Sequence, residues 1–249
     1  MGIIISSGHG LHVPGANGII NEVTEARRVT DRVAALLQQS GTPVQVFHDN
    51  SSHNQRDNIH AIVNFHNGHE RMLDVSVHFN SFIPANDFVQ MPGFRQVARG
   101  VGVEVLYANR ATERAMAEQV SAAIADSSGL INRGARLFTN LGFLNNTHRP
   151  SILIEVCFVN SVADVRLYQQ HFEAICASIA KAITGQNGTI TPPPVSPQVE
   201  QALATLVQAG VINTPAHWRQ LVAAGQTPFL DRLLLNIADQ LTTTSPYLG

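Results

Sequence analysis

The chain contains 249 residues, of which 44% are hydrophobic and 14% are charged, a composition typical of a folded globular protein. A formal net charge of −2 and the lack of a basic cluster argue against a nucleic-acid-binding protein. Because Lys181 is the only lysine, a polybasic membrane-binding patch is excluded as well.

The first apolar run, residues 2–6, is predicted to form a buried strand. This run is too short for the core of a signal peptide or for a membrane span, and no later run reaches the roughly 18 apolar residues that a span requires. We therefore expect synthesis in the cytoplasm without a signal peptide, and no membrane insertion. Cys157 and Cys176 lie in apolar segments, which predicts reduced core residues rather than a disulfide.

The next elements alternate between strands and amphipathic helices, with Asn21 as a candidate N-cap of the first helix and Gly41 as its stop. A loop with Pro84 and Pro92 is predicted between the third and fourth strands. Further strands are predicted at 43–47, 74–78, 102–107 and 151–158, and helices at about 23–37, 55–66, 112–126 and 172–183. This order predicts an α/β fold, a mostly parallel twisted sheet with helices on both faces.

A proline-rich segment divides the chain. Residues 188–197 hold four of the 12 prolines and are predicted to form a semi-rigid linker. The linker separates a large domain, residues 1–187, from a tail, residues 198–249. The domain has an ordinary size for a single domain, whereas the tail is small for a hydrophobic core of its own. Apolar residues at helical spacing predict one helix near Val199 and another near Phe229, so we expect a small all-α C-terminal domain.

Polar residues lie where the predicted strands end, which is where open α/β sheets bind ligands. His9 follows the first strand within the sequence Ser-Gly-His-Gly, and His78 is the last residue of the third strand. Glu155 interrupts the apolar strand Ile-Leu-Ile-Glu-Val. Glu22, a fourth candidate, lies in the first turn of the first helix.

Two imidazoles and a carboxylate from separate elements are typical of a catalytic zinc site, which keeps a fourth position open for water. Zinc lowers the pKa of this water towards neutrality and polarises a carbonyl. A further carboxylate must take the proton of the water and pass it to a leaving amine. Glu155 suits this role, because a buried carboxylate in an apolar strand is costly unless it faces a charge.

Each candidate also has a simpler interpretation. His9 fits a loop, His78 fits a hydrogen-bonded core group, and Glu22 fits the positive end of its helix. Only Glu155 has few structural explanations, so the joint arrangement carries the prediction. His66 shares a helix face with a neighbouring histidine, and we expect it to face the core rather than a metal.

Four segments in this order resemble the zinc-dependent N-acetylmuramoyl-L-alanine amidases of the family called amidase type 3, which includes many phage endolysins. The segments are residues 7–10, 17–22, 75–81 and 142–160, and they cover most of residues 2–184. The combination is specific to the family, although each segment alone is not.

The resemblance implies a Zn²⁺ ion held by His9, Glu22 and His78, with Glu155 as the catalytic acid and base. It implies hydrolysis of the amide bond between the lactyl group of N-acetylmuramic acid and the L-alanine of the stem peptide. Asn80 matches the family's His-x-Asn element, and we expect it to support the ligands or to contact the substrate.

The chain departs from the family's usual residues at two places that affect the expected shape of the cleft. Ser6-Ser7 stands where Asp-Pro is frequent, and Phe79 stands where alanine is frequent. Two other functions stay open: a zinc peptidase that cuts within the stem peptide, and a non-catalytic protein that binds the cell wall.

The predicted C-terminal domain is expected to bind peptidoglycan and so raise the local concentration of the enzyme, or to mediate a homo-oligomer. The expected lack of a signal peptide fits a bacteriolytic phage enzyme. Such an enzyme accumulates in the host cytoplasm and degrades the cell wall after another protein has permeabilised the membrane.

Overall fold

The computed structural model describes residues 2–81, 89–91, 94–96, 100–108, 111–185, 195–209, 211–212, 218, 222, 233–237 and 241. The chain divides into two compact units, Met1–Gly188 and Thr189–Gly249. Residues 188–194 of the predicted linker lie outside the described residues, and its last residue, Pro197, begins a helix.

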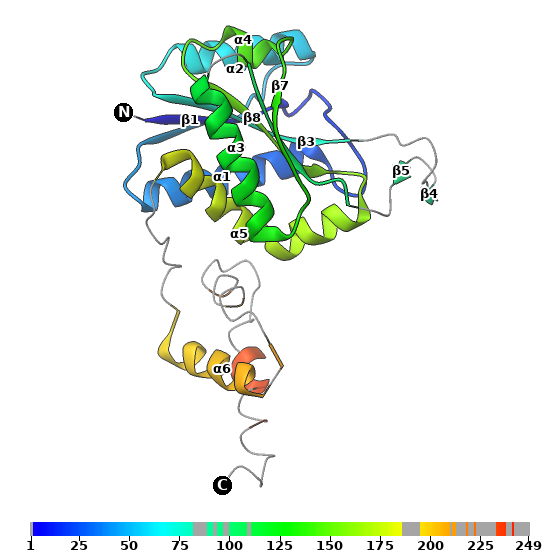
Figure 1. Cartoon of the computed structure of the whole chain (residues 1–249), viewed down its shortest axis with the longest axis vertical. Helices are drawn as coiled ribbons and strands as arrows, with labels where there is room; N and C mark the ends of the chain where they lie inside the picture. The colour runs from blue at the N-terminus through cyan, green and yellow to red at the C-terminus, as the bar shows by residue number, and fades with distance from the viewer. Residues whose placement is uncertain are drawn as a thin grey trace. The chain divides into compact units, whose positions relative to one another are not determined.

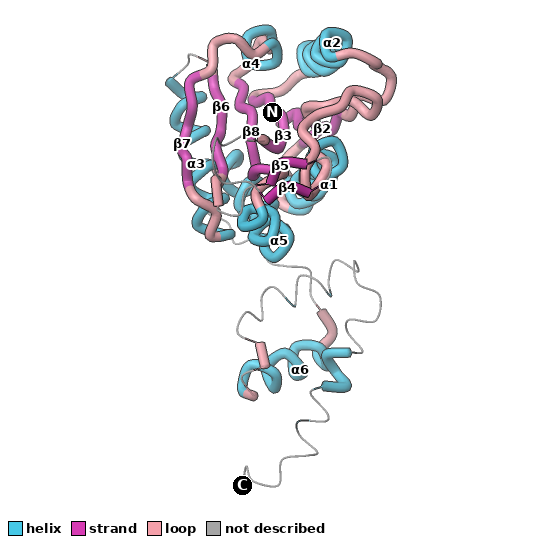
Figure 2. The backbone as a smooth tube through the Cα atoms, turned by 90° about the vertical axis from the view of Figure 1, so that its right-hand side faces the viewer, coloured by secondary structure: helices cyan, strands magenta, loops and turns pink. Residues whose placement is uncertain are grey.

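The first unit is built around a six-stranded sheet with the strand order β2-β1-β3-β8-β6-β7 (Figure 2). Its strands are β1 (Ile3–Ser7), β2 (Val44–Phe47), β3 (Leu73–Asn80), β6 (Val103–Tyr107), β7 (Asn132–Leu137) and β8 (Ser151–Phe158). Strands β1, β2, β3 and β8 are parallel to one another, whereas β6 is antiparallel to β8 and parallel to β7. The predicted α/β class with a mostly parallel sheet is therefore confirmed, with two strands reversed at one side.

Helices lie on both sides of the sheet (Figure 1). Those described in the first unit are α1 (Glu22–Gln39), α2 (Gln55–Asn67), α3 (Ala111–Ser128), α4 (Gly142–Asn146) and α5 (Val162–Thr184). Helix α1 packs on β1, β2 and β3, helix α3 packs on β6, β7 and β8, and α5 contacts both helices. Helices α2 and α4 contact each other on the opposite side, where they share a hydrophobic cluster with Leu106 of β6 and Leu153 of β8.

Helix α1 has the N-cap, the buried apolar face and the terminal glycine that its sequence predicts. The side chain of Asn21 accepts a hydrogen bond from the backbone N–H of Thr24, as an N-cap does. Ala26, Val29 and Val33 recur every three to four residues and are fully buried against the sheet. The helix ends just before Gly41, whose φ of +76° suits glycine.

Four elements were not predicted. The connection predicted as a loop contains β4 (Val89–Met91) and β5 (Phe94–Gln96), which pair antiparallel, and its Pro84 and Pro92 lie outside the described residues. Strand β7 has the sequence Asn-Arg-Gly-Ala-Arg-Leu, which contains no apolar run. The strand lies at the edge of the sheet, where fewer of its side chains need to be apolar. Helix α4 has five residues, too few for a helical period to be recognised.

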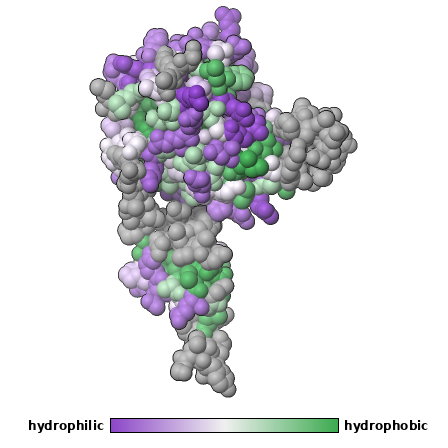
Figure 3. Space-filling model, viewed as in Figure 1, coloured by the Kyte–Doolittle hydropathy of each residue, from purple (hydrophilic) through white to green (hydrophobic). Residues whose placement is uncertain are grey.

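The surface of the first unit that carries α3 is mixed in polarity. Figure 3 shows hydrophilic residues over much of this face, with hydrophobic residues in smaller groups between them (Figure 3). This pattern is expected of helices with one face on a sheet and one in water. Among the described residues, no helix combines the length and the apolar character that crossing a membrane requires.

The second unit has a hydrophobic cluster of its own. Helix α6 (Pro197–Gln208) begins at the N-cap Ser196 and buries Val199, Leu203 and Leu206. These side chains pack with others that include Ile212 and Leu234. The described residues of this unit that have regular structure are helical, and Phe229 of the predicted second helix lies outside the described residues.

Candidate functional site

Three polar side chains meet at the edge of the sheet where β1 and β3 end. His9 lies just after β1, His78 lies near the end of the neighbouring β3, and Glu22 is the first residue of α1. One ring nitrogen of each histidine and one carboxylate oxygen of Glu22 all lie within 4.8 Å of one another. The structure thus brings together the three residues that the resemblance implies as zinc ligands.

Glu22 is the centre of this group. Its Oε1 accepts hydrogen bonds from Nδ1 of His78 at 3.0 Å and from the backbone N–H of Phe79 at 3.1 Å. Its Oε2 accepts a hydrogen bond from the backbone N–H of Ala16 and lies 3.5 Å from Nε2 of His9. The rings of His9 and His78 meet edge to face, with centroids 5.3 Å apart. The carboxylate is therefore fixed by its contacts with backbone on two sides.

The charges of the group are interdependent. Burial disfavours the charged form of Glu22, but the hydrogen bond from His78 and the nearby imidazoles outweigh burial and lower the pKa of the carboxyl group. Burial lowers the pKa of His9 more than Glu22 raises it. For His78 burial is opposed by Glu22 and by Glu155, and the net effect raises its pKa. The pKa of each of these groups therefore depends on the charges of its neighbours in the cluster.

Two glycines leave the room that these side chains occupy. A Cβ atom on Gly8 would overlap the ring of His78, and one on Gly15 would overlap Oε2 of Glu22 and lie 2.8 Å from Cδ2 of His9. The backbone at Gly8 is held from α2, where Nδ2 of Asn58 donates to its carbonyl oxygen at 2.9 Å. Gly8 and Gly15 are therefore required by close packing against the candidate ligands.

The side chains present fit a divalent cation such as Zn²⁺. Two imidazoles and one carboxylate are the donor types of a catalytic zinc site, which leaves one position for water. Nε2 of His9 lies 3.5 Å from Oε2 of Glu22, so this ring nitrogen and the carboxylate face each other. The donor set and the proximity of its atoms therefore agree with each other.

Glu155 lies beside this group and is not part of it. It pairs with His78 in the register of β8 and β3, and its buried Oε2 has no hydrogen-bond partner. Burial raises the pKa of Glu155 to about 7, since the opposing effect of His78 is offset by Glu22 and Glu104. A carboxyl group with this pKa can both accept and donate a proton near neutral pH.

Asn80 does not contact the three candidate ligands through the hydrogen bonds of its side chain. Its Nδ2 donates to Oε1 of Glu104 at 2.9 Å, and its Oδ1 accepts from the backbone N–H of Ser81 at 2.8 Å. Glu104 pairs with Glu155 in the register of β6 and β8. Sequence reasoning missed Glu104, although it interrupts Val-Glu-Val in the way that Glu155 interrupts its own strand.

The other polar groups considered from the sequence lie elsewhere. His66 is buried on α2, between Asp74 at 2.8 Å and the hydroxyl of Ser6 at 3.1 Å, as expected for a core residue. Cys157 and Cys176 are buried and free.

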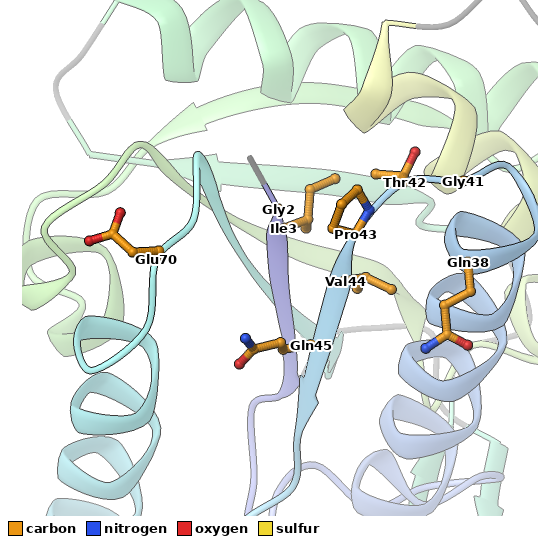
Figure 4. Close-up of a pocket in the computed structure, with 9 residues that line it drawn as sticks. All are labelled: Gly2, Ile3, Gln38, Gly41, Thr42, Pro43, Val44, Gln45 and Glu70. Atoms are coloured by element: carbon orange, nitrogen blue, oxygen red, sulfur yellow. The ribbon is translucent and has the colours of Figure 1, made fainter.

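A pocket of about 500 Å³ lies at the opposite edge of the sheet, where β1 and β2 begin (Figure 4). Side chains of Gln38, Thr42, Gln45 and Glu70 line it together with residues at the starts of the strands. It contains none of the candidate site residues.

Comparison with known proteins gives a family and a fold. Residues 3–185 match the family described as N-acetylmuramoyl-L-alanine amidase. An uncharacterized protein of Clostridium perfringens strain 13 is 28% identical over 170 residues, which are 68% of this chain and 47% of that protein. An uncharacterized 38.4 kDa protein of Clostridium perfringens is 26% identical over 193 residues, which are 74% of this chain and 53% of that protein. The chain therefore spans about half the length of the curated relatives it matches.

Solved structures share the fold. The catalytic domain of the CD27L endolysin, which targets Clostridia difficile, superposes with a TM-score of 0.64 at 21% identity, covering 76% of this chain and 99% of that one. The catalytic domain of CwlV, an N-acetylmuramoyl-L-alanine amidase from Bacillus (Paenibacillus) polymyxa, gives a TM-score of 0.57 at 23% identity and covers 74% and 97%. At these sequence identities the similarity establishes a shared fold alone.

Proposed function

The chain belongs to the N-acetylmuramoyl-L-alanine amidase family, and from this premise we propose that it is a zinc hydrolase of peptidoglycan. The bond cleaved is the amide between N-acetylmuramic acid and the L-alanine of the stem peptide. The observation that carries the proposal is the meeting of His9, Glu22 and His78 beside Glu155, a buried carboxyl group with a pKa of about 7.

His9, Glu22 and His78 would hold the Zn²⁺ ion. When bound, the ion would polarise the scissile carbonyl and lower the pKa of a water molecule. Glu155 takes the proton of the attacking water and returns it to the nitrogen of the departing alanine, so one carboxyl group acts first as base and then as acid. The backbone N–H groups of Ala16 and Phe79 keep the carboxylate of Glu22 in place throughout.

The test combines metal content with activity. We expect the purified chain to contain about one equivalent of zinc and to release L-alanine amino termini from isolated peptidoglycan. Glu155→Ala should keep the zinc and lose activity by at least about a hundredfold, the usual contribution of a positioned acid and base. Glu118→Ala, which removes an exposed carboxylate of α3, is the matched control and should behave as the wild type. Lysis retained by Glu155→Ala would refute the role given to Glu155.

A zinc peptidase is the second candidate, because the same side chains can hydrolyse any accessible amide. The two are separated by the products. An amidase releases the lactyl carboxylate together with the amino group of L-alanine, whereas a peptidase creates a new terminus within the stem peptide. A protein that binds peptidoglycan and forms neither product would instead be the non-catalytic wall-binding protein.

The second unit is proposed to bind the cell wall, since it has a hydrophobic cluster of its own behind the proline-rich segment. Removal of residues 198–249 should then reduce cosedimentation with isolated walls, and unchanged cosedimentation would reject this role. A homo-oligomer formed through this unit is the alternative, which sedimentation velocity of the full chain detects.

A bacteriolytic role in phage infection, with synthesis in the host cytoplasm, is part of the same proposal. It is supported by the fold shared with the catalytic domain of an endolysin. Expression in a bacterial host should then cause lysis only after the membrane is permeabilised. Lysis without permeabilisation would reject this route to the wall.

A further inference from the structure

Two arginines and one carboxylate continue the site across the sheet. In the register of the central strands, His78 of β3 lies opposite Glu155 of β8, and Glu155 lies opposite Glu104 of β6. Side chains of paired residues in adjacent strands project from the same face of a sheet. A polar row therefore runs from the candidate metal ligands to β6, with Glu155 in its middle.

The row ends in positive charge on β7. Nε of Arg133 lies 2.8 Å from Oε2 of Glu104, and Nε of Arg136 lies 3.7 Å from the same oxygen. The side chain of Glu104 is 11% exposed, whereas those of Arg133 and Arg136 are 32% and 52% exposed. Within the part of the chain that the structure describes, Glu104 is the only carboxylate paired with these two guanidinium groups, so the pair carries an excess positive charge that is accessible to solvent.

The backbone of β7 places both arginines on this face. Residues three apart in a regular strand project from opposite faces, because side chains alternate. Here Val103 pairs with Asn132 and Val105 with Ala135, so β7 carries one residue more than β6 between these pairs. The irregularity contains Gly134, whose φ is +77°. A bulge re-aims the side chains that follow it, which lets Arg133 and Arg136 reach the same carboxylate.

We infer that Arg133 and Arg136 form an anion subsite that binds a free carboxylate of the stem peptide, on the side of the scissile amide that departs with L-alanine. This inference rests on the proposed function. The distance suits it, because β7 lies two strand spacings, about 10 Å, from Glu155. An extended peptide rises about 3.3 Å per residue, so a carboxylate two to three residues beyond the scissile bond reaches the arginines.

Glu104 has a separate part in this subsite. Its Oε2 accepts a hydrogen bond from Nε of Arg133 and so neutralises one of the two guanidinium groups. This guanidinium group also lies over the ring of Phe158, 5.2 Å from its centroid. The other oxygen of Glu104 binds the side chain of Asn80, which follows His78 by two residues. Glu104 is thus a positioning residue that joins the anion subsite to the end of β3.

The test measures how fast the zinc-loaded full chain cleaves each of two soluble muramoyl peptides. They are identical except that the second residue, glutamate, has its α-carboxylate free in one and converted to the amide in the other. We expect the wild type to prefer the free carboxylate by about ten- to a hundredfold in kcat/KM, mainly through KM, the usual size of a charge-assisted contact. Arg136→Gln should bring the ratio of the two substrates close to one, and Arg133→Gln should lower it.

Arg114→Gln is the matched control, since Arg114 is an exposed arginine of α3 paired with Glu118. It should keep the wild-type preference. The subsite is overturned if the wild type cleaves both peptides equally well, or if Arg136→Gln keeps the preference. In both cases cleavage itself continues and the proposed function stands. If the wild type releases L-alanine neither from these peptides nor from peptidoglycan, the proposed function fails and the subsite fails with it. The half-exposed Arg136 carries the test even where Arg133→Gln alters folding.

Discussion

Gly15→Ala is expected to weaken zinc binding without unfolding the protein. The new Cβ would overlap Oε2 of Glu22 and lie 2.8 Å from Cδ2 of His9, whereas ordinary contacts begin near 3.4 Å. His9 must therefore move by about 0.6 Å, while metal-ligand distances tolerate about 0.2 Å. Because two candidate ligands are displaced together, we expect zinc affinity to fall by about ten- to a hundredfold, the range found when groups that orient metal ligands are removed.

Competition with a chromophoric zinc chelator measures this change directly. Gly41→Ala is the matched control: Gly41 follows the same helix α1 that Glu22 begins, its φ is +76°, and a Cβ there meets open space. This control should lose about 1 kcal/mol of stability through backbone strain and keep its zinc affinity. Wild-type zinc affinity in Gly15→Ala would refute the reasoning, because it would mean that His9 and Glu22 need not keep their positions to bind the ion.

Two further predictions concern stability. Asp164 is buried and accepts hydrogen bonds from the backbone N–H groups of Val101 and Gly102, both at 2.8 Å. Asp164→Asn should therefore lower the free energy of unfolding, measured with urea, by about 2–3 kcal/mol. The control Asp126→Asn, at an exposed aspartate, should leave it unchanged. Burial lowers the pKa of the His66 imidazole in the folded protein below the value of about 6.5 that it has in the unfolded chain. The neutral imidazole therefore contributes its full stabilisation above about pH 6.5, and this contribution is lost as the pH falls towards the pKa in the folded protein. The free energy of unfolding should therefore fall between pH 7 and pH 5 less steeply in His66→Gln than in the wild type, and equal slopes would contradict this account.

The parallel part of the sheet could be predicted because its strands are apolar runs separated by amphipathic helices. The same alternation locates the carboxyl ends of the strands, and the sequence therefore predicts that His9 and His78 lie at one edge of the sheet. Their convergence with Glu22 is now observed, whereas their role as zinc ligands stays a prediction.

The reversed strands could not be recognised in the same way. Strand β7 contains two arginines and a glycine in six residues, so neither its apolar content nor its period indicates a strand. No helix is predicted between 78 and 102, so the sequence offers no crossover helix to return the chain to the edge at which β3 begins. A chain without such a crossover enters its next strand from the edge at which β3 ends, and β6 accordingly runs opposite to β3 and to β8, which lies between them. Glu104 was missed because a single acid in a strand also suits a face exposed to water.

The reversal of β6 and β7 has a consequence for the site. In a parallel sheet only residues at strand ends reach the carboxyl edge, and residues at strand starts face the opposite edge, as Gly2 and Pro43 do at the pocket in Figure 4. Glu104 and Arg133 are each the second residue of their strands. They lie beside Glu155 only because these strands run against β8. The proposed site therefore combines groups from the ends of parallel strands, which are the proposed metal ligands, with groups from the reversed strands, which form the proposed anion subsite.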